Sequence, residues 1–417
     1  MNGMSAQRRQ RQPVPTHLNL IDGVLLHEKN PIPGAIQTLS LLNQYKIPYI
    51  FLTNGGGKPE TERVADLNDK LQMQLPLESF IQSHTPFQDL VDGPANLRHK
   101  TILVTGSDYE KCRQIMHNYG FQNVVTPADI FAAAPSVFPF QPIANMSQQG
   151  KPLPKPLYSA PTWDETTDFS KYLKIDAMFV LNDPRDWALD IQIYADLLQS
   201  HQGYVGTFSS PHGKGAKGWQ QDGQPALYFS NADLWWSASY HLPRFGQGAF
   251  QHSLRGIWGE ITNSTAELQS VNFGKPHTET YKFADAVLTK QWETSTQKTL
   301  KSLERFMVGA DLQGGPAPLE ILMDKKKHGG LRLRNVYMLG DNPDSDIAGA
   351  NLYSRAKDGT SWVSVLVKTG VYDPARKIPF KRDNEPKVIM EDVLSGVRWA
   401  MEREGWGAVF EGCRRIE

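Results

Sequence analysis

The sequence predicts an α/β protein in which a domain with a parallel sheet is interrupted by a second α/β domain. Three observations support this prediction. Short apolar runs alternate with segments of helical spacing along most of the chain, polar clusters follow several of these runs, and a Pro-rich stretch at 135–161 interrupts the alternation. At 417 residues the chain is also too long for one ordinary hydrophobic core.

The first elements predict a strand, a helix and a second strand. The run at 17–26 is apolar and is broken by Asp22-Gly23, which indicates a buried strand that ends in a loop. Apolar residues then recur at helical spacing, at Ile36, Leu39 and Leu42. A second apolar run at 47–52 ends at Thr53-Asn54-Gly55. Such a βαβ unit predicts a parallel sheet whose ligands collect at the carboxyl ends of its strands.

Later apolar runs define the domain boundaries. Runs at 101–105 and 177–181 predict strands of the second domain. We expect three further runs, at 271–273, 335–339 and 363–367, to complete the first sheet. The predicted map is a core domain at 17–86 and 268–417, an inserted domain at 87–267, and exposed loop insertions at 135–161 and 313–330.

Charge and cysteine content exclude several classes of protein. The 44 Lys and Arg residues balance 44 Asp and Glu residues, so no net field draws the chain to nucleic acid or acidic lipid. No apolar run reaches the roughly 20 residues that cross a bilayer, so we predict no membrane partner. The two cysteines, Cys112 and Cys413, exclude a disulfide framework and a Cys-based zinc site.

The N-terminal segment leaves two interpretations open. It holds three arginines and no acidic residue before Asp22, as mitochondrial import signals do, but its two prolines also fit a disordered basic tail. The first interpretation predicts a mitochondrial location, and the second is compatible with a cytoplasmic one.

Polar clusters follow four of the predicted strands. They are Asp22-Gly23, Thr53-Asn54, Gly274-Lys275-Pro276, and Gly340-Asp341-Asn342 continuing to Asp346. Each cluster alone fits a turn or a helix cap. Together they place a hydroxyl, a lysine and carboxylates at the ends of parallel strands. Phosphoryl transfer requires this combination for positioning and charge neutralisation.

At these clusters the chain resembles a known family. IDGVLL, FLTNGGG, FGKPHTETY and MLGDNPDSDIAGAN resemble motifs one to four of class IIA haloacid dehalogenase (HAD) hydrolases. YFSNADLWW, LPRFGQGAF and SVLVKTGVY resemble the cat eye syndrome critical region type, a mitochondrial branch related to NagD-type phosphatases. The resemblance runs from Leu18 to Trp406 outside the two loop insertions, and it implies a three-layer α/β/α Rossmann-like core with an inserted C2-type cap.

The resemblance implies a role for each cluster. Asp22 matches the carboxylate that protonates the leaving group and then activates water. Thr53 matches the hydroxyl that hydrogen-bonds the transferring phosphoryl group, and the backbone N–H groups of Asn54 and Gly55 are expected to add to its cradle. Lys275 matches the lysine that offsets charge on the nucleophile and the phosphate.

The resemblance also implies a cofactor and a substrate surface. Asp22, Asp341 and Asp346 match the carboxylates that hold Mg²⁺. One end of the cap is expected to contact a small phosphorylated metabolite through Asn231, Asp233, Arg244, Gly246 and Gly248. By contrast, we expect Trp235 and Trp236 to be packing residues, because aromatic side chains are used mainly for buried area.

The chain departs from the family at the nucleophile. The family attacks phosphorus with an aspartate two positions before Asp22, and that position is Leu20. Leucine can neither attack phosphorus nor coordinate a metal. Three hypotheses remain: a phosphohydrolase lineage with impaired turnover, a catalytically silent binding or regulatory protein, and an active enzyme whose first residues are wrongly assigned. Neither the substrate nor the oligomeric state follows from the sequence.

Overall fold

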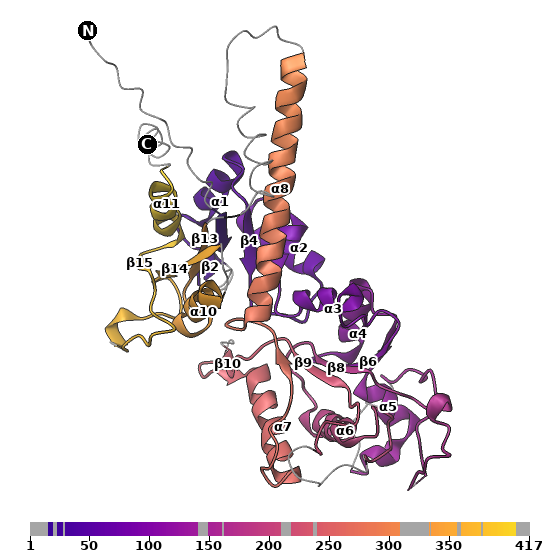
Figure 1. Ribbon diagram of the computed structural model, residues 1–417. Coiled ribbons are helices and arrows are strands. Elements are labelled where there is room, and N and C mark those ends of the chain that lie inside the picture. Colours follow the sequence, from indigo (N-terminus) through magenta and orange to yellow (C-terminus); the bar gives the residue numbers. More distant parts are fainter. Residues whose placement is uncertain are drawn as a thin grey trace, which may run out of the picture. The chain divides into compact units, whose positions relative to one another are not determined.

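The computed structural model describes residues 16–19, 23–27, 30–140, 149–160, 162–209, 218–236, 240–308, 333, 335–356, 360–376 and 378–405. Within these ranges the chain divides into two compact units (Figure 1). Unit 1 comprises Met1–Leu52, Val64–Phe80 and Tyr281–Glu417, and unit 2 comprises Thr53–Arg63 and Ile81–Thr280. The boundaries predicted from the sequence, with an inserted domain at 87–267, stay a prediction.

A six-stranded sheet forms the centre of unit 1. Its strand order is β15 (Val388–Met390), β14 (Ser361–Val367), β13 (Asn335–Gly340), β1 (Thr16–Asn19), β4 (Tyr49–Leu52) and β5 (Phe80–Ile81). The pairings of β1 with β13 and β4, and of β14 with β13 and β15, are parallel. The carboxyl ends of these five strands therefore share one edge of the sheet.

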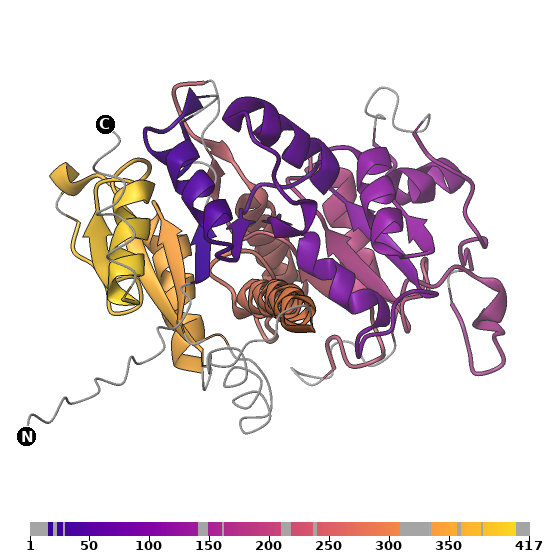
Figure 2. The same ribbon diagram turned by 90° about the horizontal axis from the view of Figure 1, so that it is seen from above.

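Helices cover both faces of this sheet. The larger helices are α1 (Ala35–Gln44), α2 (Glu60–Leu71), α8 (Thr278–Val308), α10 (Ala348–Ala356) and α11 (Val393–Arg403). On β14, the Trp362 ring packs edge-on against Tyr281 of α8 at 5.2 Å. Val365, an odd number of residues later, packs on α11 at Gly396. Because successive strand residues face opposite sides, α8 and α11 lie on opposite faces. Figure 2 shows yellow α11 against the β13 and β14 strands.

The shorter elements of unit 1 connect the strands. They are the hairpin β2 (Leu26–His27) and β3 (Asn30–Pro31), the 3₁₀ turns η1 (Leu77–Ser79) and η6 (Pro374–Arg376), and the π-helical turn η5 (Pro343–Ile347). Helix α1 confirms the spacing expected from the sequence, with Leu39 and Leu42 fully buried. Ile36, placed on the same apolar face by the spacing, is 40% exposed at the helix start.

Unit 2 is built on a five-stranded parallel sheet. Its order is β12 (Val271–Asn272), β9 (Ala226–Phe229), β8 (Ala177–Val180), β6 (Thr101–Thr105) and β7 (Asn123–Val125). The surrounding elements are α3 (Asp89–Asp92), α4 (Tyr109–Tyr119), α5 (Pro127–Ala133), α6 (Trp187–Gln199), α7 (Gln247–Ile261), the 3₁₀ turns η2 (Thr85–Gln88), η3 (Pro135–Val137) and η4 (Phe169–Lys171), and the hairpin β10 (Trp235–Trp236) and β11 (Arg244–Phe245).

Alternating strand residues build two apolar cores in unit 2. Met178 and Val180 of β8 join one core, which includes side chains of α5, α6 and α7. Ala177 and Phe179 join the other, which includes side chains of α3 and α4. The run at 271–273 also belongs here, because β12 pairs with β9. The prediction that this run completes the first sheet is therefore wrong. Phe273 packs edge-on against Phe87 at 5.1 Å, which draws the run into the second core.

Candidate active site

In unit 1, Asp341 follows β13 at the carboxyl edge of the sheet and is 7% exposed. Its Oδ2 accepts the N–H of Val371 at 2.7 Å. A Cβ atom on Gly23 would lie 2.3 Å from this oxygen, and one on Gly370 would lie 2.1 Å from it. Gly23 also has φ +77°, which disfavours other residues. Two glycines therefore make the space that the Asp341 carboxylate occupies.

The Asp341 cradle includes a loop to which the sequence had assigned no role. Thr369 donates its hydroxyl to the backbone oxygen of Gly23, and Val371 N–H binds Asp341. Both follow β14, a neighbour of β13. The signal available in the sequence was the position of Lys-Thr-Gly at the end of a predicted strand. Leu20 and Asp22 lie outside the described residues, and their roles stay predictions.

Asp346 is 1% exposed and its two oxygens are engaged locally. Oδ2 accepts the N–H of Asn342 at 3.0 Å, and Oδ1 accepts the hydroxyl of Ser345 at 3.1 Å. These bonds shape the turn η5 that follows Asp341. No group of three His, Cys, Asp or Glu side chains within metal-binding reach occurs among the described residues. The carboxylate of Asp341, cradled by backbone and glycine, still has the oxygen chemistry that Mg²⁺ prefers.

In unit 2, Thr53 begins a glycine-rich turn directly after β4. Its Oγ1 accepts the N–H of Gly55 at 3.0 Å, and Thr53 is 7% exposed. The Gly55 N–H, expected from the sequence to face a phosphate, is thus donated within the turn. The bond leaves the Thr53 hydroxyl hydrogen available to donate, which is the function expected of a phosphoryl-binding hydroxyl.

The Asn54 side chain clasps the loop that carries Lys275. Its Oδ1 accepts the N–H of Lys275 at 2.7 Å, and its Nδ2 donates to the Lys275 oxygen at 3.0 Å. The side-chain amide therefore pairs with Lys275 as a neighbouring strand would. Sequence reasoning had used only the backbone of Asn54. The clasp was missed because it joins residues 221 positions apart.

The Asn54 side-chain amide also hydrogen-bonds the loop after β9. Asn54 Nδ2 also lies 3.1 Å from both carboxylate oxygens of Asp233. Asn231 Nδ2 donates to the backbone carbonyl oxygen of Asn54 at 3.2 Å. The Asn231 Oδ1 accepts the N–H of Asp233 at 2.8 Å. Unit 2 therefore brings together Thr53, Asn54, Lys275, Asn231 and Asp233, five residues proposed for the site from the sequence.

The hairpin that follows Asp233 exposes aromatic side chains. Trp235 and Trp236 are 52% and 44% exposed, so neither ring is buried within unit 2, and their predicted role in domain packing stays a prediction. Trp235 stacks on Phe245 at 4.8 Å, and the Arg244 guanidinium lies 4.7 Å from the centre of the Tyr240 ring. A two-stranded ribbon has no second layer of its own to bury its rings. The rings and Arg244 are therefore accessible to a ligand.

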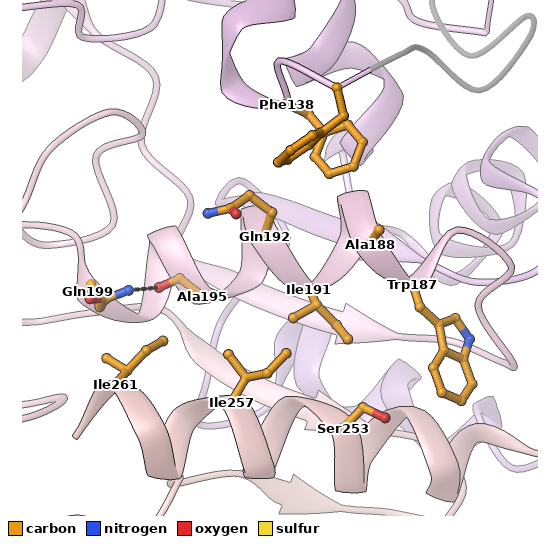
Figure 3. A pocket seen from close by; sticks show the side chains of 11 residues that line it. Phe138, Trp187, Ala188, Ile191, Gln192, Ala195, Gln199, Ser253, Ile257 and Ile261 are labelled. Carbon is orange, nitrogen blue, oxygen red and sulfur yellow. Dashed lines mark hydrogen bonds between the residues drawn. The ribbon is translucent and has the colours of Figure 1, made fainter. Parts of the chain in front are cut away.

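An apolar pocket of unit 2 is lined by none of these residues. A pocket of about 650 Å³ separates α6 from α7, with Phe138 at its rim (Figure 3). Its lining contains no ionisable side chain and none of the predicted site residues. It lacks the charge complementarity that a phosphate group requires.

Family models match two segments of the chain. Residues 21–122 match a haloacid dehalogenase-like hydrolase model, and residues 272–395 match a HAD-hydrolase-like model. A mitochondrial hydrolase of Saccharomyces cerevisiae is 36% identical over 385 residues, which cover 92% of this chain and 94% of the relative. The chain belongs to the haloacid dehalogenase-like hydrolases. By lineage it is a hydrolase, and the expected α/β Rossmann-like core is confirmed.

The chain is also similar to two further proteins, one in sequence and one in fold. A Schizosaccharomyces pombe protein described as a fusion of cardiolipin synthase and a mitochondrial hydrolase is 33% identical, and the match covers 92% of this chain and 52% of that protein. The solved glycerol phosphate phosphatase of Mycobacterium tuberculosis, in complex with magnesium, has TM-score 0.51 and 15% identity, with 92% of this chain and 78% of that chain covered. The names of both sequence relatives agree with the mitochondrial location predicted here. Within the described residues, no helix combines the length and apolarity that a membrane span requires.

Proposed function

We propose that the protein is a Mg²⁺-dependent phosphohydrolase by descent that binds a small phosphorylated metabolite, and that Leu20 limits its turnover to a trace. The observation that carries this proposal is the Asn54 clasp, which fixes the Lys275 loop to the residue that follows Thr53. A buried hydroxyl and a buried lysine on segments that one side-chain amide joins suit a phosphoryl group, because phosphoryl transfer depends mainly on positioning and charge.

Each residue has a separate task in this proposal. The Thr53 hydroxyl donates to a phosphoryl oxygen, and the Lys275 ammonium offsets the charge of the phosphate. Asp22 holds the proton for the leaving group. Asp22, Asp341 and Asp346 would hold Mg²⁺, which would supply further neutralisation of charge on the phosphoryl oxygens. The magnesium complex of the structurally similar phosphatase supports this cofactor.

The substrate surface rests on the loop and hairpin after β9. Asn231 and Asp233 hydrogen-bond Asn54, and the exposed Arg244 lies on β11. Gly246 and Gly248 shape the base of the hairpin, where a Cβ atom would meet the backbone of 232–234. We propose that Arg244 and the neighbouring rings contact the organic part of a small phosphomonoester, and that the glycines act by keeping the hairpin closed.

A second candidate function is favoured by one specific observation. With leucine at position 20, the chain can bind a phosphate and release it unchanged. Removal of the nucleophile alone from a serine protease costs on the order of 10⁶ in turnover. A silent binding or regulatory protein would keep the phosphate site and the cation site but show no hydrolysis.

The substitution Leu20→Asp tests the proposal, because it restores the missing nucleophile and one cation ligand. The unaltered chain should hydrolyse an aryl phosphate at no more than a trace rate. Leu20→Asp should gain Mg²⁺-dependent activity over several orders of magnitude, and adding Asp22→Asn should abolish the gain. Leu20→Asn is the matched control, since it is polar and of similar size but cannot act as the nucleophile.

Two outcomes would count against the proposal. Robust hydrolysis by the unaltered chain would show that the first motif is wrongly aligned. A folded Leu20→Asp protein that binds Mg²⁺ and still hydrolyses nothing would favour the silent binding protein.

A further inference from the structure

We propose that His84, Tyr119 and Glu60 are positioning residues of the phosphoryl site, because they form a one-way hydrogen-bond chain that fixes the glycine turn after Thr53. This inference rests on the proposed function, in which Thr53 contacts the phosphoryl group. None of the three residues belongs to the motifs that define the family resemblance. All three lie in unit 2 together with the turn.

The hydrogen-bond chain begins at the glycine turn after Thr53. The backbone N–H of Gly57 donates to Nε2 of His84 at 3.2 Å, and His84 is fully buried. A backbone N–H can only donate, so Nε2 must be the acceptor and cannot carry a proton. Burial lowers the pKa of His84 to about 4, so the ring is neutral near pH 7. Its single ring proton therefore sits on Nδ1.

The remaining directions follow from that tautomer. Nδ1 of His84 lies 2.6 Å from the Tyr119 hydroxyl oxygen and donates to it. The Tyr119 hydroxyl carries a single hydrogen, which it donates to Oε1 of Glu60. The Thr85 hydroxyl donates to the same oxygen at 2.7 Å. The carboxylate thus ends the chain, and each bond polarises the next toward it.

The glycine turn also packs closely against His84 and Asn182. A Cβ atom on Gly56 would lie 2.8 Å from Cδ2 of His84, so the backbone of the turn rests on the imidazole ring. Gly57 has φ +85°, and a Cβ atom there would lie 2.2 Å from Nδ2 of Asn182. Asn182 is itself fixed by two hydrogen bonds with Ser107. His84 and Asn182 therefore hold the turn from two sides.

Because the glycine turn is fixed, it orients the Thr53 hydroxyl. The turn is bonded at both ends, with Gly55 N–H on Thr53 Oγ1 at 3.0 Å and Gly57 N–H on His84. If the Gly57 bond is lost, Gly56 and Gly57 are free to change conformation. The Thr53 hydroxyl would then lose its fixed direction, and phosphate binding would weaken without any loss of charge at the site.

The experiment measures amide exchange and phosphate affinity on the full chain. The variants are His84→Phe, which keeps a ring but removes both ring nitrogens, Tyr119→Phe, which lets the imidazole take its other tautomer, and His84→Gln, whose amide can accept and donate in place of the ring. The control is His99→Gln, a histidine in unit 2 that bonds the Gln122 side chain near the surface. Hydrogen exchange is followed at Gly57, and inorganic phosphate binding is measured by calorimetry with Mg²⁺.

We expect Gly57 exchange to accelerate about tenfold in His84→Phe and Tyr119→Phe, as the loss of one net hydrogen bond predicts. Phosphate affinity should fall by a similar factor, His84→Gln should recover most of both, and His99→Gln should change neither. If His84→Phe does not fold, Tyr119→Phe decides. Unchanged Gly57 exchange in a folded variant, or equal phosphate affinity in Tyr119→Phe and the unaltered chain, overturns the proposal. If the unaltered protein binds no phosphate, the proposed function fails. The exchange data alone then decide whether the hydrogen bonds of His84, Tyr119 and Glu60 fix the turn.

Discussion

At the scale of single residues, Asp190 is a fully buried carboxyl group of unit 2. It lies on α6, is fully buried, and accepts the Thr105 hydroxyl at 2.7 Å and the Tyr109 hydroxyl at 2.8 Å. Burial raises its pKa to about 7, although the two hydrogen bonds oppose the rise. These bonds link β6, α4 and α6. The link is therefore polar and sensitive to pH.

We predict that Asp190→Asn removes a pH dependence of stability. The folded state keeps a proton on Asp190 that the unfolded state has released above its pKa of about 4. The free energy of unfolding therefore falls as pH rises from about 4 to about 7. Relative to the unaltered chain, Asp190→Asn should gain on the order of a few kcal/mol between pH 4.5 and pH 8. Urea unfolding at the two pH values measures this.

The control for Asp190 is Asp164→Asn. Asp164 is exposed, and hydrogen bonds from the Thr166 hydroxyl and backbone lower its pKa. It is ionised in both folded and unfolded states above pH 4.5, so its replacement should give a constant difference. A constant difference for Asp190→Asn as well would contradict the prediction.

At the scale of elements, the hairpin β10–β11 depends on close backbone contacts at its base. The N–H of Gly246 donates to Leu234 O, and the N–H of Gly248 donates to Asp233 O, both at 2.9 Å. A Cβ atom on Gly246 would lie 2.5 Å from Asp233 O, and one on Gly248 would lie 2.4 Å from Ala232 O. These backbone atoms have no flexible side chain to move aside, so the base tolerates no side chain at either glycine.

We predict that Gly248→Ala destabilises unit 2 by roughly 1–3 kcal/mol and weakens phosphate binding. The added methyl group would displace Asp233, whose carboxylate accepts from Asn54. The matched control is Gly256→Ala in the interior of α7, where a Cβ atom meets nothing within 4 Å. There, alanine should stabilise the helix by roughly 0.5–1 kcal/mol. Thermal unfolding and phosphate calorimetry compare the two, and equal behaviour would contradict the role of the hairpin base.

The elements also show how far the sequence could predict the fold. The runs at 101–105, 177–181, 335–339 and 363–367 all became strands, because an uninterrupted apolar run between turns has few other stable solutions. The run at 271–273 was correctly given as a strand but placed in the wrong sheet. Its partner depends on Phe273 meeting Phe87, a contact between residues far apart in the sequence. The Asn54 clasp and the His84 chain were missed for the same reason.

At the scale of the whole molecule, the two units differ in the number of chain segments that build them. Unit 1 is assembled from three separate segments and unit 2 from two. Several site residues lie where the chain passes between units, with Leu52 in one and Thr53 in the other. Thr53 and Lys275 both belong to unit 2 and are buried, so the segments near them should be protected from protease.

We predict that limited proteolysis cleaves first within 135–161. This stretch is rich in proline and polar residues, as exposed loops are. The prediction that all of it is an exposed insertion is wrong in part, because Leu153 and Leu157 pack against the first core of unit 2 and Tyr158 is 8% exposed. Within its described part, Phe140 is 65% exposed and the Lys151 side chain is 52% exposed. Thr53 and Lys275 are each below 10% exposed, so bonds near them should resist. Mass spectrometry of an early digest identifies the order of cuts. Early cleavage near Thr53 or Lys275, with 135–161 intact, would show that the predicted inserted domain at 87–267 is wrongly drawn.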